Sequence, residues 1–290
     1  MDNGQISVLY KEHKSLLFSI SYRMTGSASD AEDIVQDVFT QLGKMEVKNT
    51  DNMKALLCKM VTNRCLDLLK SSRKKRELYT GTWLPEPLAM HEEDPLFSIL
   101  QDTSISLAIM MLFEELNPIE RAIFILREVF EYDYSTVADI VQKNEINCRK
   151  ILSRIKRRLP ELANKNCVVS NKLEIEKTVS DFVAAFQQGK MEQLVHILKE
   201  DVIYYADGGG KATAALHPIY GRERVSRLLF ALTRKFEDSN YQFDMMNING
   251  AAGLALKLNN SIQAIIGFKI AHGQIEAIYY MVNPDKIKYI

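Results

Sequence analysis

The residues best suited to chemistry in this sequence are hydrogen-bond donors that recur along one helical segment near its middle. Ile151, Ile155 and Leu159 repeat every four residues, which predicts a buried face that also takes in Leu152. The outward stripes then carry Asn147, Arg149, Lys150, Ser153, Arg154 and Arg157. A helix of this kind suits the major groove of DNA, where such donors meet base edges and phosphates. A solvated basic helix of a bundle is the alternative.

The residues before this helix favour the DNA-binding interpretation. Ser135 to Leu159 reads as two helices joined by a tight polar turn near Gln142 to Glu145, and Pro160 stops the second helix. Ala138 is small where the two helices must approach closely. The segment therefore predicts a helix-turn-helix.

Two other helical segments carry charge of one sign. Asp30, Asp33 and Asp37 line one side of a helix that would repel DNA, so they favour docking on a basic protein surface. They are a poor catalytic carboxylate set, because no histidine or metal-ligand spacing accompanies them. The helix from Asn63 to Arg76 is basic and would follow phosphates, unless it is simply a solvated face.

The C-terminal part offers candidates for catalysis by residue type alone: Asp207, His196 and His217. Both histidines are more simply structural, one on a short amphipathic helix and one before Pro218 in a loop. The "DGGGK" stretch from Asp207 to Lys211 permits positive φ and close backbone approach. It lacks the spacing of a phosphate-binding loop. A regulatory contact, a plain turn and catalysis stay open for it, in that order.

Composition sets the class of molecule. The chain has 290 residues, 47% of them hydrophobic, which suffices for two or three packed domains. Its formal net charge of zero argues by itself against a nucleic-acid partner, but the charge falls in blocks of opposite sign, typical of separate surfaces. The four cysteines form no CxxC pair and are expected to be reduced and semi-buried. No signal peptide or membrane span is evident, which indicates a cytoplasmic protein.

The pattern of elements changes twice along the chain. Helical periodicity runs from Gln5 to Arg158, with an expected capping box at Ser29 and Glu32 and a proline-containing break from Tyr79 to about Pro95. After Asn171, helices are followed by a meander of strands, which predicts an α+β domain with helices on one face of a curved antiparallel sheet. We expect domains at 1–78, 105–162 and 170–290, with a linker at 79–104.

Three stretches together resemble a known family. "DAEDIVQDVF", "VTNRCLDLLKSSRKKRE" and the helix-turn-helix are similar to regions 2 and 4 of bacterial sigma factors of the extracytoplasmic-function type. The resemblance implies two all-α domains that bind core RNA polymerase, through the β′ clamp helices and the β flap, and promoter DNA. It implies polymerase contacts at Asp30, Asp33, Ile34, Gln36, Asp37 and Phe39. It implies contacts to the −10 element at Asn63, Arg64, Asp67, Lys70 and Arg73. It also implies contacts to the −35 element from the second helix of the helix-turn-helix, at Asn147, Arg149, Lys150, Ser153, Arg154 and Arg157.

The C-terminal part resembles a SnoaL-like domain, a cone of one curved sheet closed by helices. "WLPEP", "DGGGK" and "NPDK" are intact here and resemble the sigma class in which such a domain is fused and adjusts activity. The implied contacts between domains involve Trp83, Leu84, Pro85, Glu86, Pro87, Asp207, Gly208, Gly209, Gly210, Lys211, Asn283, Pro284, Asp285 and Lys286. No cofactor, metal, membrane or dedicated anti-sigma protein is expected. A small-molecule ligand in the C-terminal pocket stays open.

The proline-containing break itself is more than a tether in this interpretation. Two prolines stiffen the chain, and Trp83 with Leu84 would seek an apolar surface. We therefore expect a docked strap that sets how regions 2 and 4 are spaced. The alternatives are a ligand-responsive helix-turn-helix regulator that acts without polymerase, and an enzyme activity in the SnoaL-like domain.

Overall fold

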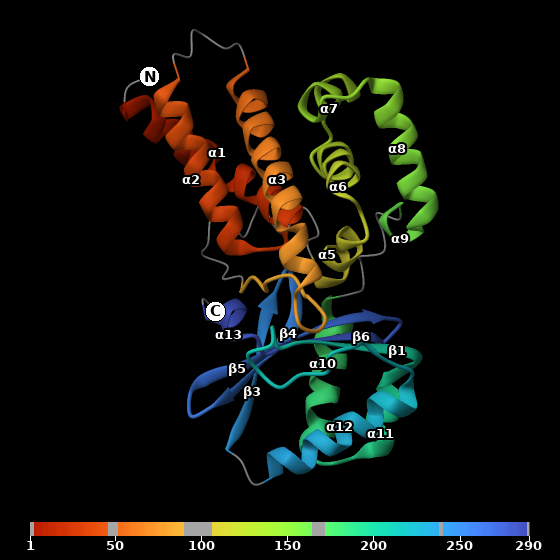
Figure 1. Cartoon of the computed structure of the whole chain (residues 1–290). Helices are drawn as coiled ribbons and strands as arrows, with labels where there is room; N and C mark the ends of the chain where they lie inside the picture. Colours follow the sequence, from red (N-terminus) through yellow and green to blue (C-terminus); the bar gives the residue numbers. More distant parts are fainter. Residues whose placement is uncertain (1–2, 46–51, 90–105, 164–171, 238–239, 289) are drawn as a thin grey trace. The chain divides into compact units, whose positions relative to one another are not determined.

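The computed structural model describes residues 3–45, 52–89, 106–163, 172–237, 240–288 and 290 (Figure 1). These residues fall into two compact units. The helical unit contains described residues up to 77 and from 109 to 163, and the C-terminal unit contains 78–89, 106–108 and the described residues from 172 onwards.

The first half of the helical unit consists of α1 (Asn3–Thr25), α2 (Ala28–Lys44) and α3 (Met53–Glu77). Gly26, at φ 70°, turns the chain after α1. Ser27 then caps α2, because it is extended and its hydroxyl accepts a hydrogen bond from the Asp30 amide at 3.1 Å. The expected capping box at Ser29 was wrong, since Ser29 already lies inside the first turn.

The second half contains α5 (Leu107–Glu114), whose first two residues belong to the C-terminal unit, and then α6 (Pro118–Phe124), a π-helical turn η1 (Ile125–Val129), α7 (Tyr134–Val141), α8 (Glu145–Arg158) and α9 (Pro160–Ala163). Asn117 caps α6 in a complete capping box with Glu120. Gln142 ends α7 in the left-handed region at φ 52°, and Asn144 caps α8. The expected helix-turn-helix is confirmed.

Several contacts join the two halves of this unit. The Arg121 guanidinium donates to the Met24 carbonyl at 2.7 Å, and Arg121 is 3% exposed. The Lys59 ammonium binds both carboxylate oxygens of Asp139, at 2.9 and 2.8 Å. The Cys58 thiol and the Tyr132 hydroxyl lie 3.1 Å apart. Helices α1 and α3 therefore pack directly on α6, α7 and the turn between η1 and α7.

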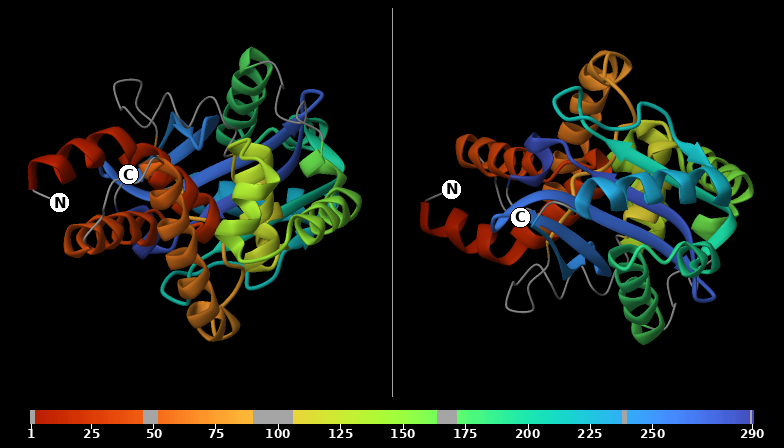
Figure 2. Two further views of the ribbon diagram at one scale, coloured as in Figure 1. Left: turned by 90° about the horizontal axis from the view of Figure 1, so that it is seen from above. Right: turned by 90° about the horizontal axis from the view of Figure 1, so that it is seen from below.

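The C-terminal unit is a six-stranded sheet with helices on one face (Figures 1 and 2). Its elements are α10 (Lys172–Gln187), α11 (Met191–Ile197), β1 (Leu198–Asp207), β2 (Ile219–Tyr220), α12 (Arg222–Glu237), β3 (Tyr241–Ile248), β4 (Ala251–Leu258), β5 (Ser261–Ala271), β6 (Gln274–Met281) and α13 (Pro284–Ile287). The strand order is β2-β1-β6-β5-β4-β3.

One pair of strands departs from the expected antiparallel sheet. The meander β3 to β6 is antiparallel as expected, but β1 lies beside β6 and runs parallel to it, with Asp207 in register with Met281. The sheet is therefore mixed. Its physical consequence is local: parallel strands end at the same edge, so the segments that follow β1 and β6 become neighbours.

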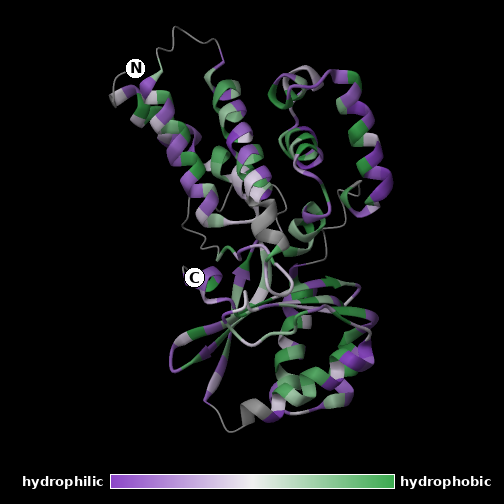
Figure 3. Cartoon of the chain, viewed as in Figure 1, coloured by the Kyte–Doolittle hydropathy of each residue, from purple (hydrophilic) through white to green (hydrophobic). Residues whose placement is uncertain are grey.

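The core of the C-terminal unit is aromatic. Phe182 of α10 meets Phe268 of β5 edge-on at 5.3 Å between ring centroids and lies 6.1 Å from Phe186. In Figure 3, α10 is largely hydrophobic, whereas α8 carries long hydrophilic runs. This contrast fits a helix buried against a sheet and a helix with one face in water.

We expect Phe182→Ala to destabilise the C-terminal unit by about 3–5 kcal/mol, because it leaves a cavity between α10 and the sheet. Urea unfolding followed by fluorescence measures this, since the only tryptophan, Trp83, belongs to this unit. Asp181→Ala, a change at the exposed neighbour, is the control. An unfolding midpoint equal for both variants would contradict the assignment of Phe182 to the core.

Candidate functional site

Helix α8 presents every donor that the sequence analysis assigned to it. Cys148, Leu152 and Ile155 are buried against α6 and α7. Six side chains are exposed on the other faces: Asn147, Arg149, Lys150, Ser153, Arg154 and Arg157. The Asn144 side chain accepts from the Asn147 amide at 2.8 Å and fixes the start of the helix.

Two of these arginines are held by residues that the sequence analysis missed. The Arg149 guanidinium lies 4.0 Å from the Tyr134 ring centroid and 3.2 Å from the Glu145 carboxylate. Arg154 and Arg158 each donate to one oxygen of Glu120, at 2.9 and 3.0 Å. These partners restrict the rotamers of the long arginine side chains.

Glu120 is unusual for a carboxylate because its side chain is only 4% exposed. Burial acts to raise the pKa of Glu120, but hydrogen bonds from Arg158, the Asn117 amide and Arg154 outweigh it and hold the pKa below its usual value. The charged form of Glu120 is thus the one that holds the two arginines.

On α2 and α3 the candidate residues divide by burial. Asp33, Gln36 and Asp37 of α2 are exposed and Asp30 is half-buried, whereas Ile34 and Phe39 lie in the core, at 7% and 5% exposure. On α3, Arg64, Asp67 and Lys70 are exposed and Asn63 is half-buried. Arg64 and Asp37 form an ion pair at 3.4 Å. The Arg73 side chain lies outside the described residues.

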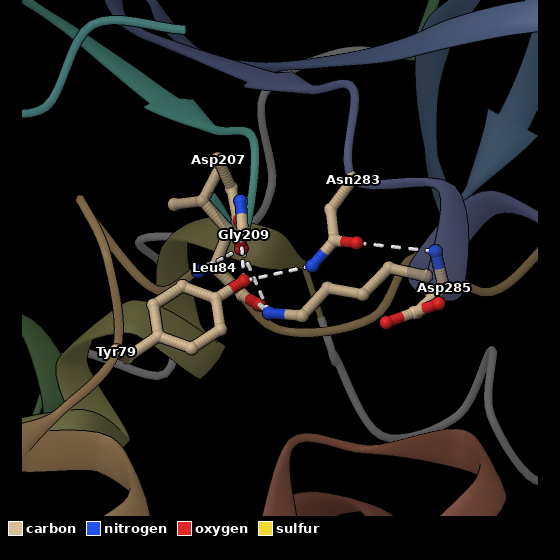
Figure 4. A network of polar contacts seen from close by, with 7 residues as sticks. Tyr79, Leu84, Asp207, Gly209, Asn283 and Asp285 are labelled. Carbon is tan, nitrogen blue, oxygen red and sulfur yellow. Dashed lines mark hydrogen bonds and ion pairs between the residues drawn. The ribbon is translucent and has the colours of Figure 1, made fainter. Parts of the chain in front are cut away.

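The remaining candidates meet at one edge of the C-terminal sheet (Figure 4). The parallel pairing of β1 with β6 brings the DGGGK segment beside the NPDK segment, because both follow the paired ends Asp207 and Met281. The strap, residues 79–89, lies against both segments. All of these residues belong to the C-terminal unit.

Asp207 is the centre of this site and has no exposed surface. One carboxylate oxygen accepts from the Tyr79 hydroxyl at 2.5 Å and the Gly209 amide at 3.0 Å. The other accepts from the Leu84 amide at 2.9 Å and the Lys286 ammonium at 2.8 Å. A buried carboxylate needs such partners, since its desolvation is otherwise unfavourable by several kcal/mol, as a rough figure. Burial, and then the bond to Asp207, raise the pKa of the Tyr79 hydroxyl, which keeps it a donor.

Lys286 lies between the strap and the sheet. Its ammonium also donates to the Leu84 carbonyl and lies over the rings of Trp83 and Tyr79, at 4.1 and 5.2 Å from their centroids. The Lys286 side chain is 7% exposed. Two aromatic faces, a carbonyl and a carboxylate thus replace the water that the ammonium loses on burial.

The strap is held at its far end as well. Leu88 and Asn249 exchange two hydrogen bonds, both of 2.9 Å: the Leu88 amide donates to the Asn249 side chain, and the Asn249 amide donates to the Leu88 carbonyl. Ala89 forms an antiparallel bridge with Ile248, the last residue of β3. Between the two ends, Leu84, Pro85 and Pro87 are buried, while Trp83 and Glu86 are half-buried.

The glycines of DGGGK are required by close approach. Gly209 has φ 58°, and a Cβ there would lie 2.3 Å from the Asn283 side-chain nitrogen. A Cβ on Gly208 would lie 2.2 Å from the Ala212 carbonyl oxygen. Next to them, Lys211 and Asp285 form an exposed ion pair at 2.5 Å. Gly210 and Pro284 are on the outer, accessible side.

The sequence analysis missed Tyr79 and Asn249 as members of this site. Nothing near Tyr79 in the sequence marks it, because its partners Asp207 and Asn283 lie 128 and 204 residues away. Asn249 has φ 53°, a conformation that asparagine tolerates, and this is the one local signal that it offered.

The three residues singled out by type for catalysis form no hydrogen-bonded group among the described residues. The hydrogen bonds of the Asp207 carboxylate come from Tyr79, Leu84, Gly209 and Lys286, and His196 and His217 are exposed. Among the described residues, no group of histidines, cysteines and carboxylates could hold a metal ion. Within the same residues, no helix is long and apolar enough to cross a membrane.

The two halves of the helical unit match known families. Residues 9–75 match sigma-70 region 2, and residues 106–159 match sigma-70 region 4. Together with the helix-turn-helix and its exposed donors, these matches define the class: the protein is a bacterial sigma factor, which binds core RNA polymerase and promoter DNA to initiate transcription. A regulator that acts without polymerase and an enzyme are both set aside by this finding.

The relatives define the subclass over the whole chain. The chain is 28% identical to the ECF RNA polymerase sigma factor SigJ of Mycobacterium tuberculosis, over 93% of this chain and 89% of SigJ. It is 22% identical to a probable ECF sigma factor, SigI, of the same species, over 97% and 94% of the two chains. The crystal structure of SigJ superposes with a TM-score of 0.79, at 25% identity, over 97% of this chain and 98% of that one. The protein is an extracytoplasmic-function sigma factor, SigJ-like, and its C-terminal α+β domain lies within the length that it shares with SigJ.

We expect removal of either partner of the buried ion pair to destabilise the C-terminal unit by about 3–5 kcal/mol, because the other charge is left buried. Asp207→Asn and Lys286→Met are the single variants, and the double variant is expected to be less destabilised than their sum. Urea unfolding with Trp83 fluorescence measures all three. Changes at the exposed pair, Lys211→Met and Asp285→Asn, are the matched controls and should do little. Strictly additive losses at Asp207 and Lys286 would contradict their coupling.

Proposed function

We propose that the NTF2/SnoaL-like domain modulates this sigma factor by holding the linker between regions 2 and 4. The observation that carries the proposal is the buried contact of the strap with Asp207 and Lys286. The strap begins two residues after α3 ends, and the start of region 4 is held too, since Leu107 packs on Gly267 of β5. The segment that follows region 2 and the segment that begins region 4 are therefore both anchored on one domain.

The arrangement within the helical unit supports a restrained state. The −10 and −35 elements are about 25 base pairs apart, or about 85 Å along B-DNA at about 3.4 Å per base pair. In the structure, Lys59 lies one helical turn before Asn63, and it binds Asp139 on the first helix of the helix-turn-helix. Regions 2 and 4 packed in this way would not reach both elements at once, so they must separate for promoter binding.

The proposed sequence of events follows from these two restraints. The exposed acidic face of α2 docks on the polymerase, α3 contacts the −10 element and α8 contacts the −35 element. Release of the strap lengthens the free linker, which favours the separated state of regions 2 and 4. The fused domain would thus replace a dedicated anti-sigma protein, and the protein would act in the cytoplasm. A small molecule bound by that domain would enter only as an effector of the same equilibrium.

We expect Trp83→Ala and Asp207→Ala to raise promoter-specific transcription severalfold, because a released strap frees the linker. The measurement is run-off transcription with purified core enzyme and full-length protein at equal concentrations. Lys211→Ala, in the same loop but exposed, is the control and should leave the rate unchanged. Unchanged activity in both strap variants would refute modulation, and a fall in activity with intact folding would refute the restraint.

A separate prediction concerns Arg154 at the −35 element. If its guanidinium reads a base, Arg154→Ala should weaken binding of the holoenzyme to its promoter by about 1–3 kcal/mol and relax sequence preference at one position. Promoter variants scanned base by base in a binding assay measure this. An equal loss on every sequence would make Arg154 a phosphate contact instead.

A further inference from the structure

Ile146 stands out on the recognition helix because it is apolar and 65% exposed. It is the second residue of α8, all of which the structure describes. The other apolar side chains of this helix, Cys148, Ile151, Leu152 and Ile155, are buried or half-buried. Most of the surface of Ile146 therefore faces solvent and not the packing that holds α8 on the unit.

Folding offers no reason for isoleucine at this position. Isoleucine is a weaker helix former than arginine, lysine, glutamine or glutamate, and the exposed part of its apolar surface gains nothing from burial. Single exposed apolar residues are common on proteins, so exposure alone means little. What distinguishes Ile146 is the set of exposed polar side chains that share its side of the helix.

Helical spacing places Ile146 on the face that carries the donors for DNA. Residues three, four and seven positions along share its side of the helix, and these are Arg149, Lys150 and Ser153, all exposed. In a helix-turn-helix, side chains at the N-terminal end of the second helix contact base edges. Ile146 therefore sits where a base pair is read, with no donor or acceptor to read it.

The major groove has one apolar group that such a side chain can recognise, the 5-methyl group of thymine. We propose that Ile146 contacts the methyl group of one thymine in the −35 element and selects for that base. The proposal deepens the proposed function, since it rests on α8 reading the −35 element. Arg149 and Lys150 beside it would bind polar edges or phosphates, and Ile146 would add discrimination by shape and apolar contact.

The test removes the methyl group and nothing else. The promoter is first obtained by selection from a random library with core enzyme and the full-length protein. Each thymine of its −35 element is then replaced by deoxyuridine, one at a time, and holoenzyme binding is measured. At one thymine the wild type should lose about fourfold in affinity, the factor expected for burial of one methyl group. Ile146→Ala should lose a similar factor on the thymine promoter and become insensitive to deoxyuridine at that position.

Controls separate this inference from the function on which it rests. Val8→Ala, at an exposed valine of α1, should bind both promoters as the wild type does. If Ile146→Ala keeps the wild-type sensitivity to deoxyuridine while Lys150→Ala and Arg157→Ala weaken promoter binding, Ile146 does not read the methyl group and α8 still reads the element. No sensitivity at any thymine in the wild type also overturns the inference. If all three α8 variants bind normally, the proposed reading of the −35 element fails with it.

Discussion

The buried ion pair between Asp207 and Lys286 is the interaction on which the C-terminal half of the protein depends. The burial of two charges is unfavourable in free energy unless further polar groups surround them, and here the strap supplies those groups. The Leu84 amide and carbonyl, the Tyr79 hydroxyl and the Trp83 ring complete the shell. The pair is therefore satisfied only when the strap is in place. Such an arrangement adds little net stability, but it specifies one path for a segment that has no secondary structure of its own.

The path of the strap depends on the relative direction of two neighbouring strands, β1 and β6. If β1 ran antiparallel to β6, Asp207 and the NPDK segment would lie at opposite ends of the sheet. The parallel register puts Asp207 opposite Met281 instead, and Asn283 then follows within bonding distance: its amide donates to the Asp207 carbonyl at 3.0 Å. Sheet topology, a long-range property, thus decides whether the linker has a docking site. Under the proposed function, a linker docked in this way couples the spacing of regions 2 and 4 to the fused domain.

Much of this could be predicted from local sequence, and most of what was missed depends on contacts between distant residues. The capping box expected at Ser29 was a local error, since Ser27, two residues earlier, caps α2. The helix-turn-helix followed from apolar periodicity, a small residue and turn chemistry that act within a few residues. The meander of strands in the C-terminal part was predicted for the same reason. The parallel place of β1, the role of Tyr79 and the clamp of Glu120 on Arg154 were missed, because each joins residues far apart in the chain. The grouping of the strap with its two partner segments came from resemblance to a family, and no spacing within the sequence would have given it.

The C-terminal domain holds the strap at one edge of its sheet. Its interior is occupied by its own aromatic side chains, among them Phe182, Phe186 and Tyr204. The carboxylate with the residue type for acid–base chemistry, Asp207, lies at the sheet edge and is fully engaged by four donors. A group bonded in this way has no free lone pair directed at a substrate and no solvent path for a proton. The same burial that removes it from catalysis makes it an anchor, because any movement of the strap leaves a charge without its partners.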